Sequence, residues 1–144
     1  MIKAIRHFGI VVKDLEKELS FYRDLLGLKI VSAADESGEY LDNMLALGNV
    51  RVKTVKMSAE SGPTLVELLK FDSHHSDYPG RGTIFEKGPS HFAFTVNDLD
   101  ECYRRLTEAG VRFNSPPQKS PDGRAKVTFC EDPEGNLIEL VEPC

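Results

Sequence analysis

HFGIVVKDL at residues 7–15 recurs as HFAFTVNDL at residues 91–99, and TLVELL at residues 64–69 recurs as NLIELV at residues 136–141. Each copy of this pattern has a histidine near its start and a glutamate near its end. Self-similarity of this kind is typical of chains built from repeated structural units. We therefore expect two pseudo-symmetric halves, packed so that the histidine and the glutamate of each half can meet at one place.

Both copies have the pattern of a strand, a helix and further strands. Residues 4–13 are rich in β-branched and aromatic side chains, Asp14 is a good helix N-cap, and Gly27 is a typical helix stop. In the second copy we expect a strand at residues 91–97 and a helix that begins after Asp98. A short extended segment should follow each helix. Further strands are expected at residues 41–48, 50–58, 64–71, 124–131 and 136–143.

Other segments contain residues that are typical of turns and loops. DPEGN at residues 132–136 predicts a tight turn between the last two strands. Residues 72–90 join the two copies, and residues 114–123 are interrupted by prolines. Each of these two loops is either a lid that contacts a substrate or a solvated connector. The adjacent histidines at 74–75 are expected at the surface, because neighbouring side chains in a polar loop seldom converge on one ion.

Length and composition limit the class of protein. With 144 residues, of which 40% are hydrophobic, the chain is long enough for a single domain that spans residues 1–144. The formal net charge of −5 includes no basic block, which argues against a nucleic-acid partner. No stretch has the roughly 18–20 apolar residues of a membrane span, and the first residues run directly into a strand-like pattern instead of the pattern of a leader. We therefore expect a cytoplasmic protein without a membrane partner.

The histidines and glutamates of the repeat are candidates for a metal site. Because side chains alternate along a strand, His7 and His91 lie on the faces that carry small neighbours. Glu67 and Glu139 lie inside apolar runs, where an unpaired carboxylate costs several kcal/mol. Such a group is normally protonated, ion-paired or bound to a metal. Its occurrence at matched positions beside matched histidines favours metal binding.

The quoted motifs resemble those of a known superfamily. The openings at residues 7–30 and 91–113, together with the ending FCEDPEGNLIELVE at 129–142, resemble the vicinal oxygen chelate superfamily. This superfamily includes glyoxalase I, methylmalonyl-CoA epimerase, extradiol dioxygenases and antibiotic-resistance proteins. The resemblance implies an α+β fold of two βαβββ modules, at residues 4–71 and 91–142, joined by the loop at 72–90. It also implies mixed sheets that curl around a metal-binding cleft, and two chains associated as a homodimer.

The resemblance also implies the ligands of the metal. In glyoxalase-like members they come from the first and last strand of each module, positions that here hold His7, Glu67, His91 and Glu139. Two imidazoles and two carboxylates without a thiolate suit a divalent ion such as Zn, Ni, Co, Mn or Fe(II). The three cysteines form no CxxC pair and are expected to be reduced thiols outside the site.

The activity implied by this ligand set is that of a lyase or isomerase acting on a small carbonyl substrate. The metal would polarise substrate oxygens and stabilise an enediolate, while a carboxylate moves the proton. Glu139 is the first candidate for this base and Glu67 the second. Bacterial glyoxalase I has an arginine after its first histidine and an asparagine after its first glutamate, both of which hold glutathione. Here those stretches are GIVV and LLKF, so Arg81 is the candidate for holding an anionic substrate.

Three other functions remain open. A thioester epimerase, as in methylmalonyl-CoA epimerase, would use similar proton transfer. An Fe(II) extradiol-type dioxygenase needs only two histidines and one carboxylate, with open positions on the iron. A ligand-sequestering resistance protein would hold a metal or a drug without turnover.

Overall fold

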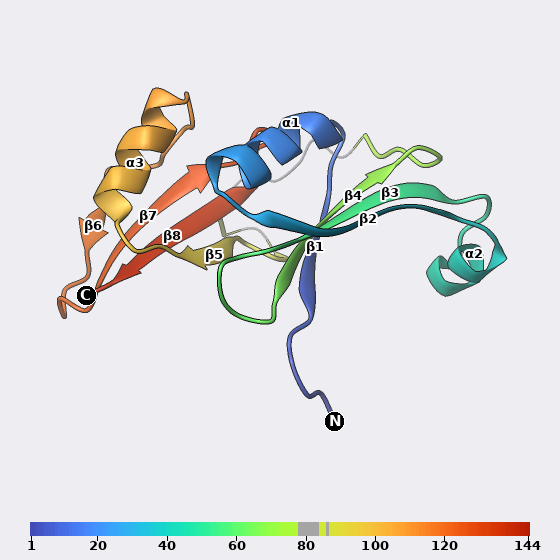
Figure 1. The fold of residues 1–144 in the computed structure, drawn as a ribbon, viewed down its shortest axis with the longest axis horizontal. Coiled ribbons are helices and arrows are strands. Elements are labelled where there is room, and N and C mark those ends of the chain that lie inside the picture. Colours follow the sequence, from blue (N-terminus) through green and yellow to red (C-terminus); the bar gives the residue numbers. More distant parts are fainter. Residues whose placement is uncertain (78–83, 86) are drawn as a thin grey trace. The chain divides into compact units, whose positions relative to one another are not determined.

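The chain forms two compact units, residues Met1–Tyr78 and Pro79–Cys144, and each contains one four-stranded mixed sheet (Figure 1). The computed structural model describes residues 1–77, 84–85 and 87–144. None of the helices in these ranges combines the length and the apolar content that crossing a membrane would require.

In the first unit the sheet order is β1-β4-β3-β2. The first strand pairs parallel with the last, and the other neighbours are antiparallel. The short connection from β3 to β4 is a hairpin, whereas β1 joins the sheet beside a strand that is distant in sequence. The elements are β1 (His7–Val11), α1 (Leu15–Leu19), η1 (Ser20–Leu25), β2 (Lys29–Ser37), α2 (Glu39–Leu45), β3 (Arg51–Ser58) and β4 (Leu65–Phe71).

The first predicted helix is confirmed, but its second half is a π-helix, with hydrogen bonds that span five residues instead of four. It begins after Asp14, whose side chain accepts a hydrogen bond of 3.1 Å from the backbone N–H of Lys17. After α1 the chain continues as the π-helix η1, in which the N–H of Leu26 reaches the carbonyl of Phe21. Phe21 and its neighbour Tyr22, both in η1, are buried, at 2% and 0% exposure.

The strand predicted at residues 41–48 is wrong, because this segment contains helix α2. Leu41, Met44 and Leu45 have the i, i+3, i+4 spacing of a helix rather than the alternation of a strand. Leu41 packs in a small core with Val50 and Val52. The carboxylate of Asp42 accepts hydrogen bonds from the N–H groups of Asn49 and Val50, at 2.9 and 2.8 Å, and so fixes the chain after the helix.

The second unit repeats the topology of the first. Its sheet order is β5-β8-β7-β6, with the first strand again parallel to the last. Two βαβββ modules are therefore confirmed. The elements are β5 (Phe92–Thr95), α3 (Leu99–Glu108), β6 (Gln118–Lys119), β7 (Ala125–Glu131) and β8 (Leu137–Pro143).

The helix of this unit is confirmed and the strand after it is not. Asp98 caps α3 by accepting from the N–H of Glu101 at 2.9 Å. The expected strand after α3 is reduced to an isolated bridge between Phe113 and Cys130. The second strand of the module is instead the two-residue β6, inside the segment 114–123 that was predicted as a loop. The prolines of this segment lack the N–H groups that a longer strand would need.

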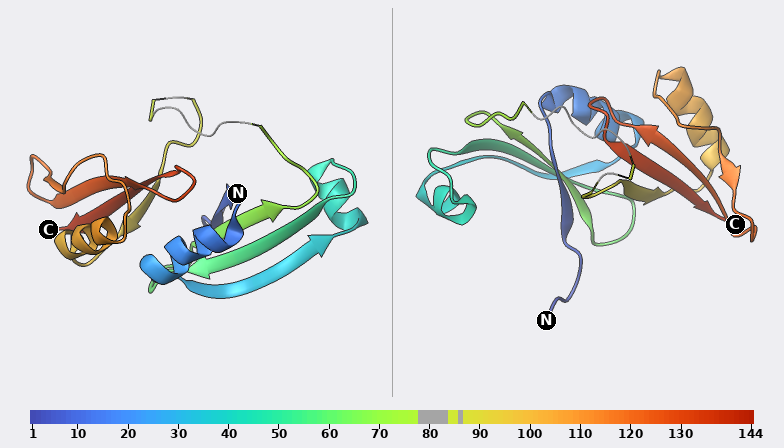
Figure 2. Two further views of the ribbon diagram at one scale, coloured as in Figure 1. Left: turned by 90° about the horizontal axis from the view of Figure 1, so that it is seen from above. Right: turned by 180° about the vertical axis from the view of Figure 1, so that it is seen from behind.

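The alternation of the first strand in each unit is confirmed. In β1, Ile10 is 5% exposed and faces the helix side of the sheet, whereas Val11 is 65% exposed. Figure 2 shows α1 lying over this helix side. In β5, Phe94 is half-buried and the adjacent Thr95 is exposed. We call the opposite side, which carries His7 or His91, the histidine face of each sheet.

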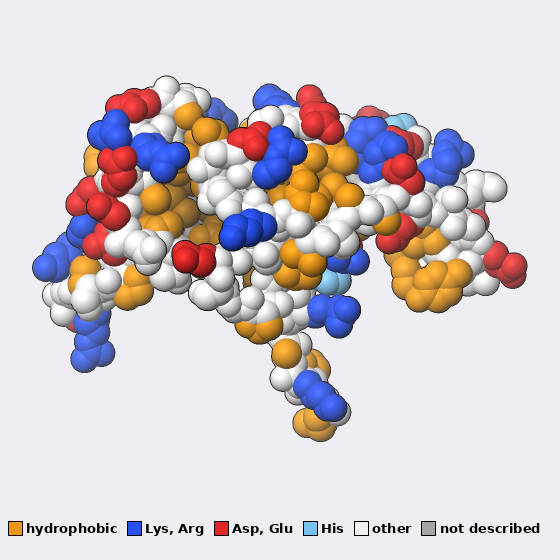
Figure 3. Space-filling model, viewed as in Figure 1, with side chains coloured by type: hydrophobic (Ala, Val, Ile, Leu, Met, Phe, Trp, Pro, Cys, Tyr) orange, Lys and Arg blue, Asp and Glu red, His pale blue; other side chains and the backbone are white. Residues whose placement is uncertain are grey.

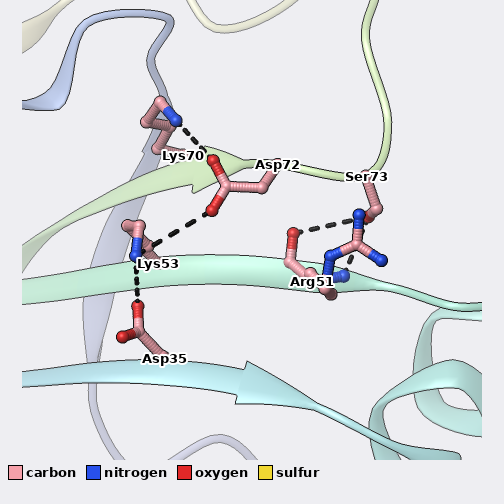
Figure 4. Close-up of polar contacts among 6 residues, drawn as sticks. All are labelled: Asp35, Arg51, Lys53, Lys70, Asp72 and Ser73. Carbon is pink, nitrogen blue, oxygen red and sulfur yellow. Dashed lines mark hydrogen bonds and ion pairs between the residues drawn. The ribbon is translucent and has the colours of Figure 1, made fainter.

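Beyond α1, the helix side of the first sheet carries a row of charges from three strands (Figure 4). The ammonium of Lys53 lies 2.9 Å from Asp35 and 4.0 Å from Asp72, which also accepts a hydrogen bond from Lys70. The hydrogen bond to Asp35 raises the pKa of Lys53, and the bond from Lys70 lowers the pKa of Asp72. These groups are solvated, so the row stabilises the fold only weakly.

Apolar side chains are exposed around α2. Figure 3 shows them gathered at this helix. Tyr40 is 81% exposed and Met44 is 58% exposed, and both project from α2 while Leu41 of the same helix is buried.

The DPEGN turn is confirmed and is organised by a buried aspartate. Asp132 is 4% exposed and accepts from the backbone N–H groups of Glu134 and Asn136 and from the amide of Asn136, at 3.1, 2.7 and 2.7 Å.

Replacing Asp132 by alanine is expected to lower the free energy of unfolding by about 1.5–3 kcal/mol, because these donors lose a charged acceptor. Urea unfolding of the wild type and the variant measures the change in the free energy of unfolding. Asp132→Asn keeps one acceptor oxygen and should recover part of the loss; equal stability of all three proteins would contradict the prediction.

Candidate functional site

Glu67 lies in the centre of the first sheet, on its histidine face. Its strand, β4, runs between β1 and β3, where Gly9 and Lys56 are its register partners. One carboxylate oxygen, Oε2, lies 3.1 Å from Nε2 of His7, and the other, Oε1, lies 3.2 Å from Nζ of Lys56. The side chain of Glu67 is 10% exposed. Glu67 is therefore a nearly buried carboxylate held between an imidazole and an ammonium group.

Glu139 has the same place in the second sheet. Its register partners are Ala93 on β5 and Phe129 on β7. Oε2 of Glu139 lies 3.2 Å from Nε2 of His91, and the imidazole of His91 meets the ring of Phe129 edge to face, with centroids 5.2 Å apart. The Glu139 side chain is 23% exposed. Each unit thus holds one histidine and one glutamate in contact.

The spacing within each pair fits two neighbouring ligands of one metal ion. Ligand bonds of about 2.1 Å that meet at ~90° to ~109° place the two donor atoms about 3.0–3.4 Å apart. The observed distances, 3.1 Å for His7 and Glu67 and 3.2 Å for His91 and Glu139, lie within this range. The same spacing suits a direct contact between imidazole and carboxylate. The donor atoms are therefore compatible with a divalent ion without requiring one.

A serine orients one of the two imidazoles. Oγ of Ser90 lies 2.7 Å from Nδ1 of His91, so that Nε2 of the same ring is directed at Glu139. Which ring nitrogen carries the proton depends on the tautomer. Histidines that bind metals commonly have a partner of this kind on the second ring nitrogen, because it fixes the orientation of the ring.

The remaining predicted residues lie elsewhere or outside the described ranges. His74 is held by Ser73, whose Oγ lies 2.8 Å from Nδ1. Burial raises the pKa of the Cys130 thiol to about 12, so this cysteine stays protonated. Arg81 lies outside the described residues. Among residues 1–77, 84–85 and 87–144, no group of three or more His, Cys, Asp or Glu side chains is close enough to hold a metal.

Sequence reasoning missed Lys56, Phe129 and Ser90. The first two occupy the same position of the repeat, since each is the register partner of the buried glutamate on the adjacent strand. Lys56 lies 11 residues before Glu67, whereas Phe129 lies 10 residues before Glu139, so aligning the two hairpins on their glutamates does not pair these positions. Ser90 precedes the histidine directly, but nothing in the sequence indicated that its hydroxyl turns back toward the ring.

Comparison with known proteins identifies the family. The model of the Glyoxalase/Bleomycin resistance protein/Dioxygenase superfamily matches residues 4–140, and the chain belongs to this superfamily. A protein of Bacillus subtilis, uncharacterised YwkD, is 32% identical over 99% of this chain and 98% of its own length. A probable lactoylglutathione lyase of Synechocystis is 29% identical over 94% of this chain and 92% of its own.

Solved structures agree with this assignment. A glyoxalase family protein from Bacillus cereus is similar with a TM-score of 0.88 and 26% identity, covering 99% of this chain and 95% of that one. The fold expected from the sequence motifs is therefore confirmed. The superfamily includes lactoylglutathione lyases, and it also includes proteins that are not enzymes.

Proposed function

We propose that this chain is a metal-dependent lyase or isomerase that acts on a small carbonyl compound. His7, Glu67, His91 and Glu139 would together hold one divalent ion, supplied by one chain or by two associated copies. The observation that carries the proposal is the pair of matched histidine–glutamate contacts, at 3.1 and 3.2 Å, on equivalent strands of the two modules. The similarity to lactoylglutathione lyases supports the same class of reaction.

The two glutamates would have different parts in the reaction. When bound, the ion supplies a Lewis acid that polarises a substrate oxygen. The carboxylate of Glu139 would remove the proton from the carbon beside the carbonyl, while the electron pair of the C–H bond moves toward the carbonyl oxygen. The same carboxylate would then return the proton to the former carbonyl carbon, while the hydroxyl proton of the first carbon passes to the former carbonyl oxygen, so that the carbonyl group has moved by one carbon. Glu139 is the first candidate because its side chain is 23% exposed, against 10% for Glu67 between His7 and Lys56.

The proposal is tested by measuring metal binding and proton exchange on the same samples. The protein is loaded in turn with Zn, Ni, Co, Mn and Fe(II), and its metal content is determined. NMR then follows the exchange of substrate C–H protons with deuterated solvent, across a panel of α-hydroxy and α-keto carbonyl compounds. We expect one ion per chain and exchange with at least one compound. Stoichiometric metal without any exchange over the panel would contradict catalysis by proton transfer.

Replacing Ser90 by alanine is expected to weaken zinc binding by about tenfold to a hundredfold. The hydroxyl of Ser90 contacts Nδ1 of His91, and its loss leaves the imidazole free to rotate away from Glu139. A competition titration with a chelator measures the zinc dissociation constant. Ser73→Ala is the matched control, since Ser73 contacts His74 in the same way but outside the proposed ligand set. If both variants bind zinc like the wild type, Ser90 has no positioning role.

A further inference from the structure

We propose that Lys56 binds an anionic group of the substrate, so that the preferred substrates are small carbonyl compounds with a carboxylate or phosphate. This inference rests on the proposed function. Lys56 is not one of the four proposed ligands, and it is part of the same histidine face because it is the register partner of Glu67 on β3.

The two modules differ at this position. The register partner of the buried glutamate is Lys56 in the first module and Phe129 in the second. Phe129 packs its ring against His91 and brings no charge, whereas Lys56 brings an ammonium group to 3.2 Å from Glu67. Of the ion pairs among the described residues, none joins Glu139 to a lysine or an arginine. Within its own module, each glutamate pair therefore has a different neighbour, an ammonium group in the first and an aromatic ring in the second.

The ammonium group of Lys56 has more N–H donors than its contact with Glu67 uses. A lysine carries three N–H donors, and the one ion pair described for Lys56 is with Oε1 of Glu67. The side chain of Lys56 is 34% exposed, against 10% for Glu67. Lys56 can thus remain next to Glu67 and still donate to a group that arrives from the solvent side.

The charge of the proposed site also favours an anion. Two carboxylates balance a divalent ion, and the two imidazoles are neutral when they act as ligands. Lys56 then leaves the loaded site with one positive charge in excess. A negatively charged substrate would neutralise this charge, and an ammonium group is a common binder of carboxylates and phosphates.

The experiment compares three related probes that differ in charge. Dihydroxyacetone is neutral, hydroxypyruvate carries a carboxylate in place of one hydroxymethyl group, and dihydroxyacetone phosphate carries a phosphate. Calorimetry measures their dissociation constants on the zinc-loaded Glu139→Gln protein, with and without Lys56→Met. Zinc affinity is measured in parallel. Lys53→Met is the matched control, because Lys53 lies on the same strand but is ion-paired on the opposite side of the sheet.

We expect Lys56→Met to weaken binding of at least one anionic probe by about tenfold to a hundredfold, and to leave dihydroxyacetone within about twofold. If the dissociation constant of hydroxypyruvate changes more, Lys56 binds a carboxylate; if that of dihydroxyacetone phosphate changes more, Lys56 binds a phosphate. Zinc affinity should stay equal or rise, because Lys56 no longer competes for Glu67. Lys56→Arg should bind the anionic probes almost as the wild-type residue does. Lys53→Met should change neither the zinc affinity nor the affinity for the anionic probes.

Two results would overturn the inference. Equal weakening of neutral and anionic probes, or a lower zinc affinity with unchanged anion binding, would mean that Lys56 only supports Glu67. These results leave the proposed function intact. Failure of the wild-type protein to bind a stoichiometric ion would instead overturn the proposed function, and the role of Lys56 with it.

Discussion

Replacing Glu139 by glutamine is expected to slow substrate C–H exchange by about 10²–10⁴-fold while zinc stays bound. General base catalysis contributes an acceleration of this size, and the amide of glutamine cannot accept the proton. The side-chain oxygen remains available beside His91, which lies 3.2 Å from it in the wild type. Deuterium exchange followed by NMR gives the rate, and metal analysis of the same sample gives the zinc content.

Glu67→Gln is the comparison that separates the two glutamates. Glu67 is held on one side by His7 and on the other by Lys56, so this variant should lose more zinc affinity than Glu139→Gln. The rate of substrate C–H exchange per bound zinc should fall less in Glu67→Gln than in Glu139→Gln. The opposite order, with exchange abolished by Glu67→Gln and retained by Glu139→Gln, would assign the base to Glu67.

Replacing Leu68 by alanine is expected to lower the free energy of unfolding of the first unit by about 2–5 kcal/mol. Leu68 is fully buried on β4, on the helix side of the sheet, directly after Glu67. Truncating a buried leucine removes apolar contacts and leaves a cavity that the surrounding side chains fill only in part. Urea unfolding followed by circular dichroism measures the change.

Val11→Ala is the matched control for the Leu68 variant. Val11 pairs with Leu69 on the neighbouring strand but is 65% exposed, so its truncation should change stability by about 0.5 kcal/mol or less. Leu140, 1% exposed, is the counterpart of Leu68 in the second module and should respond as Leu68 does. If Leu68→Ala unfolds like the control, the helix side of the sheet is not the core of the unit.

The repeat explains how much of this molecule could be predicted from its sequence. The two strand–helix openings and the two glutamate strands were predictable because each pattern occurs twice. The contacts of His7 with Glu67 and of His91 with Glu139 depend on the parallel pairing of the first and last strand of each module, which the sequence analysis did not predict. Helix α2 was missed because its apolar residues were interpreted as a strand. The π-helix η1 was missed because Leu19, Tyr22 and Leu26 have the ordinary spacing of an α-helix.

Features that lack a counterpart in the other module were the ones that sequence reasoning overlooked. Lys56 has no equivalent charge in the second module, where Phe129 occupies its position. Similarly, the short β6 depends on local backbone hydrogen bonds in a segment rich in proline, which no residue pattern marks as a strand. Symmetry therefore predicted the shared framework, and the differences between the modules appeared only in the structure.

The parallel pairing of β1 with β4 links ion binding to the order of folding. His7 and Glu67 come from the beginning and the end of the first module, so their contact forms only when this distant pairing is complete. Contacts between residues far apart in sequence form slowly, because a long loop must close first. An ion that binds the closed pair would hold the two ends together and slow their separation. A nascent chain that has not yet released β4 from the ribosome would expose His7 without its partner Glu67.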